Sequence, residues 1–290
     1  MNTSLTIARQ LIHGAIKGLN AYIKPGGLHR IKPERVFDEI ICNLITTLDS
    51  VVEGIELGDK IRKGELSLAG LDQGKLLSKA IREIYRNCNV VHPQYVIPLI
   101  VGGIAIGLSN AENILEDWGK LKKAMDMICS INRWNELKQL IETLRAVGRV
   151  DMYEHLQSTG ISQITIIRMG ASFDDLYRVL SSKWPGFSVI ESRENILYNN
   201  IKRLVDINRE YQSLNHSIIA LYMEMIESRI PVNLKNKLHE VRKYKYMQTA
   251  EGVKMLYELD ILFKKNGISF EDVTEVITML SAYASFEGLK

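Results

Sequence analysis

The chain has 290 residues, of which 46% are hydrophobic and 24% are charged, with 37 Lys and Arg against 34 Asp and Glu. This composition is typical of a globular protein large enough to bury a core, and it excludes disordered and collagen-like chains. A net charge of +3 lacks the concentrated basic excess of a nucleic-acid-binding surface, so we expect no nucleic-acid partner.

Cysteine usage and hydropathy bear on location. The three cysteines, Cys42, Cys88 and Cys129, are widely spaced and include no CxxC pair, so they indicate neither a disulfide framework nor a zinc site. Charged residues interrupt the apolar pattern of segment 1–19, which therefore differs from a signal peptide. The most apolar run, 95–108, is shorter than the roughly 20 residues that cross a bilayer. We expect a protein of a reducing compartment, the cytoplasm, with no membrane association.

Hydrophobic residues recur with a helical period in almost every segment, which predicts an all-α fold. Because no Gly-, Ser- or Pro-rich linker divides the chain, we expect a single multi-helix domain over 1–290, although a degenerate solenoid of helix pairs stays open. Only 161–169 has the pattern of a strand. The predicted helices cover about 4–20, 36–55, 72–88, 94–109, 111–128, 133–147, 173–182, 191–228, 238–265 and 270–286.

The helix predicted at 94–109 contains the sequence GGIAIG at 102–107. This resembles a dinucleotide-binding loop only weakly, because no strand is predicted before it. Glycines and alanine at this spacing let a neighbouring helix approach closely. We therefore expect a buried helix with a close neighbour.

The segment KPGGLHR at 24–30 carries the strongest local signal for a ligand. A glycine pair lets backbone N–H groups come close to an anion, and Lys24, His29 and Arg30 add positive charge, which together favour phosphate. The alternative is a helix end, with Gly26 or Gly27 in the left-handed conformation and the cations in solvent.

The longer segment NAYIKPGGLHR at 20–30 resembles the N-terminal motif of archaeal members of the triphosphoribosyl-dephospho-CoA synthase family. The likeness continues with EGIELG at 53–58, GLDQGKLLSKAIREIYRN at 70–87 and HSIIALYMEMIESRIP at 216–231. The resemblance implies an all-helical transferase. Its reaction moves a triphosphoribosyl group from ATP to the ribose hydroxyl of dephospho-CoA, with release of adenine.

Such a reaction needs a clamp for the triphosphate, a stabilised anomeric carbon and a base for the attacking hydroxyl. His29 and Glu53 are the predicted catalytic residues: His29 protonates the departing adenine, and Glu53 orients Mg²⁺ or the hydroxyl. Glu53 and Glu56 are the predicted ligands of Mg²⁺, with ATP as substrate. The predicted nucleotide-binding residues are Lys24, Gly26, Gly27, Arg30, Asn89, His92, Gln94, Arg242 and Lys243.

The chain departs from the family pattern at several places, and an Asn-Pro-Gly expected near its end is missing. The residues from His92 to Val96 replace the central Asn-Thr and following Gly, Tyr211-Gln212 replaces an Arg-Asp pair, and Lys237 replaces an Asp. A second hypothesis is therefore a non-catalytic descendant that binds a nucleotide or a partner protein. A helical-repeat adaptor is a third. The sequence also leaves open the acceptor and whether the chain forms a homo-oligomer.

Overall fold

The computed structural model describes residues 3–31, 34–131, 133–162, 170–191 and 195–289. Within these ranges the chain forms 14 α-helices, several short 3₁₀ helices and no strand. The predicted all-α class is confirmed. The strand predicted at 161–169 falls almost wholly outside the described residues.

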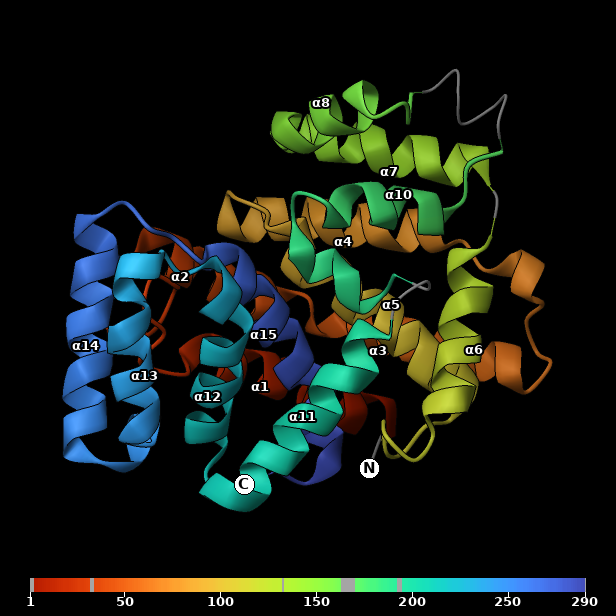
Figure 1. The fold of residues 1–290 in the computed structure, drawn as a ribbon. Coiled ribbons are helices and arrows are strands. Elements are labelled where there is room, and N and C mark those ends of the chain that lie inside the picture. The colour runs from red at the N-terminus through yellow and green to blue at the C-terminus, as the bar shows by residue number, and fades with distance from the viewer. Residues whose placement is uncertain (1–2, 32–33, 132, 163–169, 192–194, 290) are drawn as a thin grey trace.

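Four helices form the centre of the molecule (Figure 1): α1 (Thr3–Asn20), α3 (Leu48–Arg62), α5 (Pro93–Ser109) and α15 (Glu271–Ala284). The most extensive contacts between helices join α3 to α5 and α1 to α15. The first and last helices of the chain are thus packed side by side, which brings residues at 20–30 next to residues at 270–280.

The remaining helices surround this centre (Figure 1). One group, drawn at the top, consists of α7 (Trp134–Ala146), α8 (Val150–Ser158) and α10 (Phe173–Ser181), and α4 (Gln73–Cys88) packs against α7. The other flanking helices are α2 (Arg35–Thr46), α6 (Trp118–Cys129), α11 (Ile196–Tyr211), α12 (Leu214–Ile226), α13 (Lys235–Lys243) and α14 (Ala250–Lys265).

The apolar helix α5 is buried from Pro93 to Gly107, as the sequence predicts. Its glycines permit the approach of α3, because a Cβ at Gly107 would lie 2.1 Å from the Ile55 carbonyl oxygen. The reverse holds for Gly58 of α3, where a Cβ would lie 2.1 Å from the Ile104 oxygen. None of the helices in the described ranges combines the length and apolarity needed to span a membrane.

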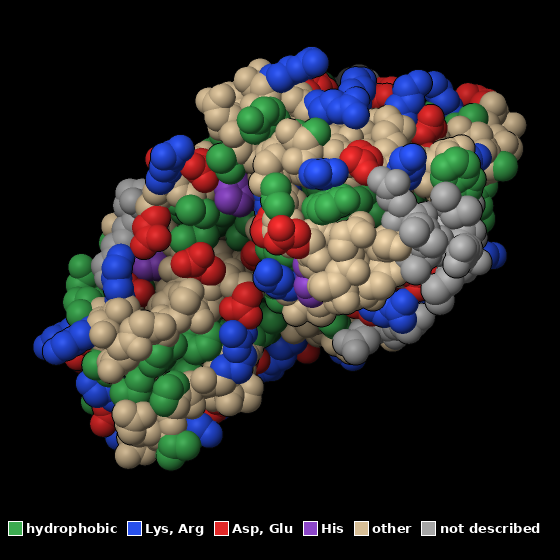
Figure 2. Space-filling view, turned by 90° about the horizontal axis from the view of Figure 1, so that it is seen from above, with side chains coloured by type: hydrophobic (Ala, Val, Ile, Leu, Met, Phe, Trp, Pro, Cys, Tyr) green, Lys and Arg blue, Asp and Glu red, His purple; other side chains and the backbone are tan. Residues whose placement is uncertain are grey.

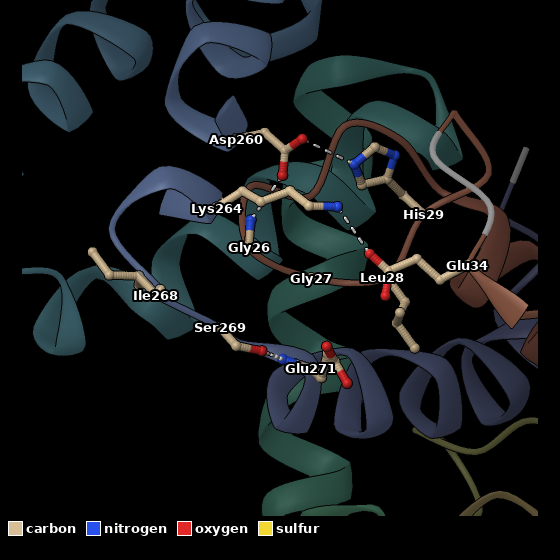
Figure 3. Close-up of a pocket in the computed structure, with 11 residues that line it drawn as sticks. Gly26, Gly27, Leu28, His29, Glu34, Asp260, Lys264, Ile268, Ser269 and Glu271 are labelled. Atoms are coloured by element: carbon tan, nitrogen blue, oxygen red, sulfur yellow. Dashed lines mark hydrogen bonds and ion pairs between the residues drawn. The ribbon is translucent and has the colours of Figure 1, made fainter. Parts of the chain in front are cut away.

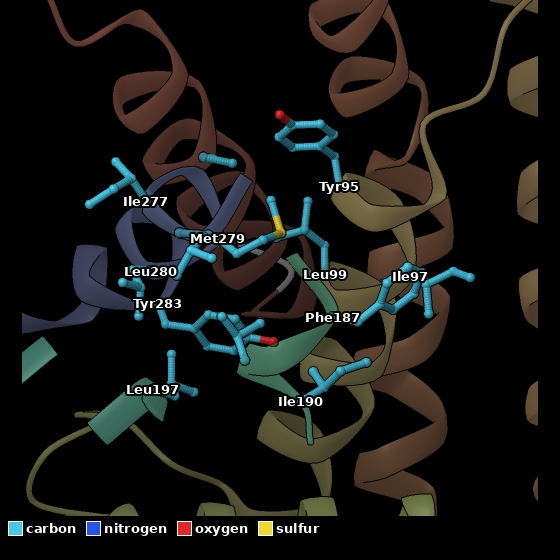
Figure 4. Close-up of a cluster of buried hydrophobic side chains, with 14 of the residues drawn as sticks. Tyr95, Ile97, Leu99, Phe187, Ile190, Leu197, Ile277, Met279, Leu280 and Tyr283 are labelled. Atoms are coloured by element: carbon cyan, nitrogen blue, oxygen red, sulfur yellow. The ribbon is translucent and has the colours of Figure 1, made fainter. Parts of the chain in front are cut away.

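Aromatic and aliphatic side chains of α5, α15, α11 and the 3₁₀ helix η2 (Pro185–Val189) meet in the core (Figure 4). Tyr283 is fully buried there, and its hydroxyl donates a hydrogen bond to the Pro98 carbonyl oxygen over 2.7 Å. This bond satisfies the phenol inside an apolar environment, where an unpaired hydroxyl would cost free energy.

Several predicted helices are shorter than expected. Thr47 separates α2 from α3 within the predicted 36–55 helix, and Gln212, at φ 51°, ends α11 within the predicted 191–228 helix. Lys245 and Tyr246, also at positive φ, separate α13 from α14. Helix α6 begins at Trp118 rather than near 111, and α8 was not predicted.

The expectation that the cysteines form no disulfide is wrong. Cys42 of α2 and Cys88 at the end of α4 are bonded, with Cα atoms 6.0 Å apart and a sequence separation of 46. The helices bring the two together, which no local spacing reveals. Cys129 is free and buried, and burial raises the pKa of its thiol. Cysteine usage therefore no longer supports the expectation of a reducing compartment.

Candidate functional site

The segment 21–31 connects α1 to α2 and is held by residues far along the chain. The Phe270 N–H donates to the Gly26 carbonyl oxygen (2.7 Å), and the Leu28 N–H donates to Thr274 Oγ1 (3.2 Å). The Tyr222 hydroxyl donates to the Pro25 carbonyl oxygen (2.8 Å). This segment, the 21–31 loop, is therefore fixed against α12 and the start of α15.

The glycine pair of this loop serves packing rather than anion binding. Gly26 has φ 72°, which L side chains rarely adopt, and a Cβ at Gly27 would lie 2.6 Å from Thr274 Oγ1. The Gly26 N–H donates to Asp260 Oδ1 (3.0 Å) and the Gly27 N–H to the Lys24 carbonyl oxygen (2.9 Å). Since both N–H groups are engaged, the predicted phosphate cradle at Gly26 and Gly27 is wrong.

Lys24 is also placed differently from the prediction. Its side chain is fully buried, and Nζ donates to the carbonyl oxygens of Gly18 (2.8 Å) and Leu19 (2.9 Å) in the last turn of α1. Burial lowers the pKa of Lys24 well below its ordinary value. The ammonium satisfies carbonyl groups that a helix end leaves without partners, so the prediction that Lys24 holds a phosphate is wrong.

His29 lines a cavity of ≈ 230 Å³ between the 21–31 loop, α14 and the start of α15 (Figure 3). The ring is only 2% exposed, and Nε2 lies 3.6 Å from Oδ2 of Asp260. Nδ1 has no hydrogen-bond partner among the described residues. A buried imidazole with one nitrogen beside a carboxylate and the other unpartnered is the arrangement of a general acid or base.

The other charges at this cavity are mostly acidic. Glu34, Asp260 and Glu271 line it together with Lys264, whose Nζ lies 3.2 Å from Glu34 Oε1. Burial, and then the charge of Glu34, raise the pKa of Glu271. Three carboxyl groups beside Lys264 and His29 do not favour phosphate groups inside this cavity. They favour a ligand with hydroxyl or amino groups.

A second polar cluster, made by Gln94, Arg149, Gly186 and Glu275, lies beside the first cavity. Gln94 Nε2 donates to Glu275 Oε1 (3.1 Å), the Gly186 N–H donates to Glu275 Oε2 (3.2 Å), and Arg149 Nη1 donates to Gln94 Oε1 (3.3 Å). Burial raises the pKa of Glu275 to about 7. Glu271 and Glu275 are four residues apart on α15, so they share one face and connect the cavity to this cluster.

The predicted 89–94 turn belongs to this second cluster and not to the cavity at His29. Asn89 ends α4 at φ 61°, and the His92 N–H donates to Asn43 Oδ1 (2.7 Å). His92 Nε2 lies 3.3 Å from Glu39 Oε2, and burial lowers the pKa of His92.

The surface seen from above is hollowed between the α13–α14 side and the α7–α8–α10 side, with Asp, Glu and His side chains gathered around the hollow (Figure 2).

The acids predicted to bind Mg²⁺ lie apart from the cavity at His29. Glu53 is 44% exposed and forms an ion pair with Lys79 (2.7 Å), and Glu56 is exposed on the same helix. Neither lines the cavity at His29. The described residues contain no group of three or more His, Cys, Asp or Glu side chains arranged for a metal. Glu53 and Glu56 therefore do not form one site with the cavity at His29.

The remaining predicted cations also lie away from His29. Arg242 Nη1 is 3.7 Å from Glu227 Oε2, and Lys243 is exposed in the last turn of α13. Arg30 is next to His29 in sequence, but its guanidinium carbon lies 4.1 Å from the centre of the Tyr22 ring and its side chain lines a different cavity. The loop therefore places His29 and Arg30 at separate cavities.

The sequence interpretation missed Asp260, the closest partner of His29. Its signal is visible in retrospect, because Leu256, Leu259 and Phe263 form a buried helical face and Asp260 lies within it. A carboxylate on such a face needs a partner inside the protein. Nothing in the sequence identifies that partner, which lies more than 200 residues earlier in the chain.

No family model, no curated protein and no solved structure matches the chain. The resemblance to triphosphoribosyl-dephospho-CoA synthases therefore stays a prediction, and the candidate function depends on the geometry of the site.

Proposed function

We propose that the protein acts on the N-glycosidic bond of a nucleotide, transferring the triphosphoribosyl group of ATP to a hydroxyl acceptor of the dephospho-CoA type. The observation that carries the proposal is His29, a buried imidazole that lines a cavity, with Nε2 beside Asp260 and with no partner for Nδ1 among the described residues. Loss of adenine needs a proton donor in such a position, since the departing base leaves with the electron pair of the broken bond.

In the proposed reaction, His29 gives the proton on Nδ1 to the base as the bond between the anomeric carbon and the base nitrogen breaks. Asp260 stabilises the protonated ring through Nε2. The acceptor oxygen forms the new bond to the anomeric carbon and loses its proton to Glu271. The pKa of Glu271 is raised by burial, which makes its carboxylate a better base. No step is assigned to Glu53 or Glu56.

The test is release of free adenine from ATP in the presence of Mg²⁺ and dephospho-CoA, measured by chromatography. His29→Asn should lower the rate by about 100-fold or more, the usual size of a general-acid effect. His239→Asn is the matched control, because His239 is exposed on α13. Equal rates for the wild type and His29→Asn, at equal melting temperature, would refute the assignment of His29.

A second candidate function is binding of a nucleoside without chemistry. It is favoured by the internal hydrogen bonds of Gly26, Gly27 and Lys24, which leave the cavity at His29 without the phosphate contacts expected of a triphosphate enzyme. Calorimetric titration with adenosine distinguishes the two. Binding of adenosine that is lost in His29→Asn, without adenine release from ATP, would favour this candidate over the transferase.

A further inference from the structure

A second, larger cavity lies on the other side of the 21–31 loop. Its charged side chains are basic, whereas those at the cavity of His29 are mostly acidic. Its volume is ≈ 480 Å³, against ≈ 230 Å³ for the cavity at His29, and it lies between the end of α1, Arg30 and the first turn of α12. Three potentially cationic side chains line it, His13, Lys17 and Arg30, and no Asp or Glu of the described chain does so.

These cations have no countercharge in the described part of the protein. His13 and Lys17 are one turn apart on α1, so they lie on the same face, and both are exposed. Neither they nor Arg30 form an ion pair with a described residue. Like charges held together without an acid repel each other, and a bound anion would remove that cost.

The geometry of the cavity is fixed by the protein itself. Asn215 of α12 donates from Nδ2 to the Tyr22 carbonyl oxygen (2.9 Å) and accepts from the Tyr22 N–H at Oδ1 (3.1 Å). This pair of bonds ties Tyr22 to α12, and Arg30 lies over the Tyr22 ring at 4.1 Å. The guanidinium is thus held beside the Tyr22 ring, and its donor groups have no partner in the described ranges, so less entropy is lost on binding.

The polar and apolar residues that line the cavity indicate which chemical groups its ligand carries. Leu214 and Ile218 of α12 and Ile16 of α1 supply apolar surface, and the first turn of α12 adds the positive end of a helix dipole to the three cations. A volume of this size is within the range of small-molecule sites, about 300–1,000 Å³.

From these observations we infer that the cavity binds a small molecule that carries two or more phosphates next to an apolar or aromatic group, of the nucleoside diphosphate class. The phosphates contact Lys17, Arg30 and His13, and the apolar group packs against Leu214 and Ile218. This inference is independent of the chemistry proposed for His29, because the two cavities share no lining residue.

Calorimetric titration with ADP, inorganic pyrophosphate and adenosine tests the inference. ADP should bind most tightly, pyrophosphate more weakly, and adenosine should show no binding that depends on Lys17. Lys17→Gln and Arg30→Gln should each weaken ADP and pyrophosphate binding by about 10- to 150-fold, as expected for the loss of one charge-assisted contact. Raising the salt concentration should weaken both.

Lys202→Gln is the matched control, since Lys202 is exposed on α11 and does not line the cavity. His29→Asn should leave pyrophosphate binding unchanged, which separates this inference from the proposed function. Absence of ADP and pyrophosphate binding in the millimolar range, or unchanged affinity in both variants, would overturn the inference. Tighter binding of a single-stranded oligonucleotide than of ADP, lost in the same variants, would also overturn it.

Discussion

Lys24 and His29 of the 21–31 loop are both buried, but their side-chain nitrogens differ in how many hydrogen-bond partners the protein provides. Lys24 Nζ has two carbonyl partners at the end of α1, whereas Nδ1 of His29 has no partner within the part of the chain that the structure describes. A buried polar atom without a partner costs free energy. Lys24 therefore has a structural role, and of the two buried residues His29 is the one that remains available to a ligand.

Replacement of Lys24 tests this distinction. In Lys24→Met the carbonyl groups of Gly18 and Leu19 lose their donor, so the variant should be less stable by about 1–3 kcal/mol. The folded variant should bind ADP as the wild type does, because Lys24 lines neither cavity. Thermal unfolding and calorimetry measure the two effects. Unchanged stability with loss of ADP binding would instead restore Lys24 as a phosphate ligand.

At the scale of elements, the contact of α3 with α5 depends on glycines that face the partner backbone. Both Gly58 and Gly107 leave no room for a side chain, because the atoms that a Cβ would meet are main-chain atoms, which cannot turn away as a side chain does. Close approach of this kind increases the van der Waals contact between two helices. It also makes their packing sensitive to a single methyl group.

Gly107→Ala should therefore destabilise the protein by about 1–3 kcal/mol through overpacking. Gly119→Ala is the matched control, since Gly119 lies in α6 with no atom within 4 Å of its added Cβ. Alanine is the better helix former, so this control should be neutral or stabilising by up to about 1 kcal/mol. Denaturant unfolding of both variants gives the comparison, and equal losses would contradict the packing argument.

Across the whole molecule, Glu275 joins segments that are distant in sequence, through hydrogen bonds to Gln94 of α5 and Gly186 of η2. Burial raises its pKa from 4.5 to about 7. Between these values the folded protein keeps a proton that the unfolded chain has lost. Stability from this group is therefore full below about pH 4.5, falls as the pH rises to about 7, and is constant above it.

The free energy of unfolding of wild type and Glu275→Gln, measured from pH 5 to 8, tests this dependence. The free energy of unfolding of the wild type, minus that of Glu275→Gln, should decrease by a few kcal/mol from pH 5 to pH 8, since one pKa unit corresponds to about 1.4 kcal/mol. Using the difference removes the titration of other groups. A difference that does not vary with pH would contradict the raised pKa of Glu275.

The sequence predicts the parts of this structure that depend on local pattern. Helical period identifies α5 and its buried glycines, because each residue packs with neighbours three or four positions away. Several partners of the 21–31 loop, among them Asp260, Phe270 and Thr274, lie more than 200 residues later, and no local pattern indicates them. The same limit applies to Cys42 and Cys88. The sequence therefore indicates that the loop is important but does not reveal the roles of its residues.

The disulfide between Cys42 and Cys88 has a topological consequence. It closes residues 42–88 into a covalent ring that contains all of α3, the helix against which α5 is packed. The ring persists when the protein unfolds, so the denatured chain has fewer conformations to gain. Closing a loop of this length should contribute about 4 kcal/mol. A reductant should lower the melting temperature of the wild type and have no effect on the Cys42→Ser, Cys88→Ser double variant, whose ring is open from the start.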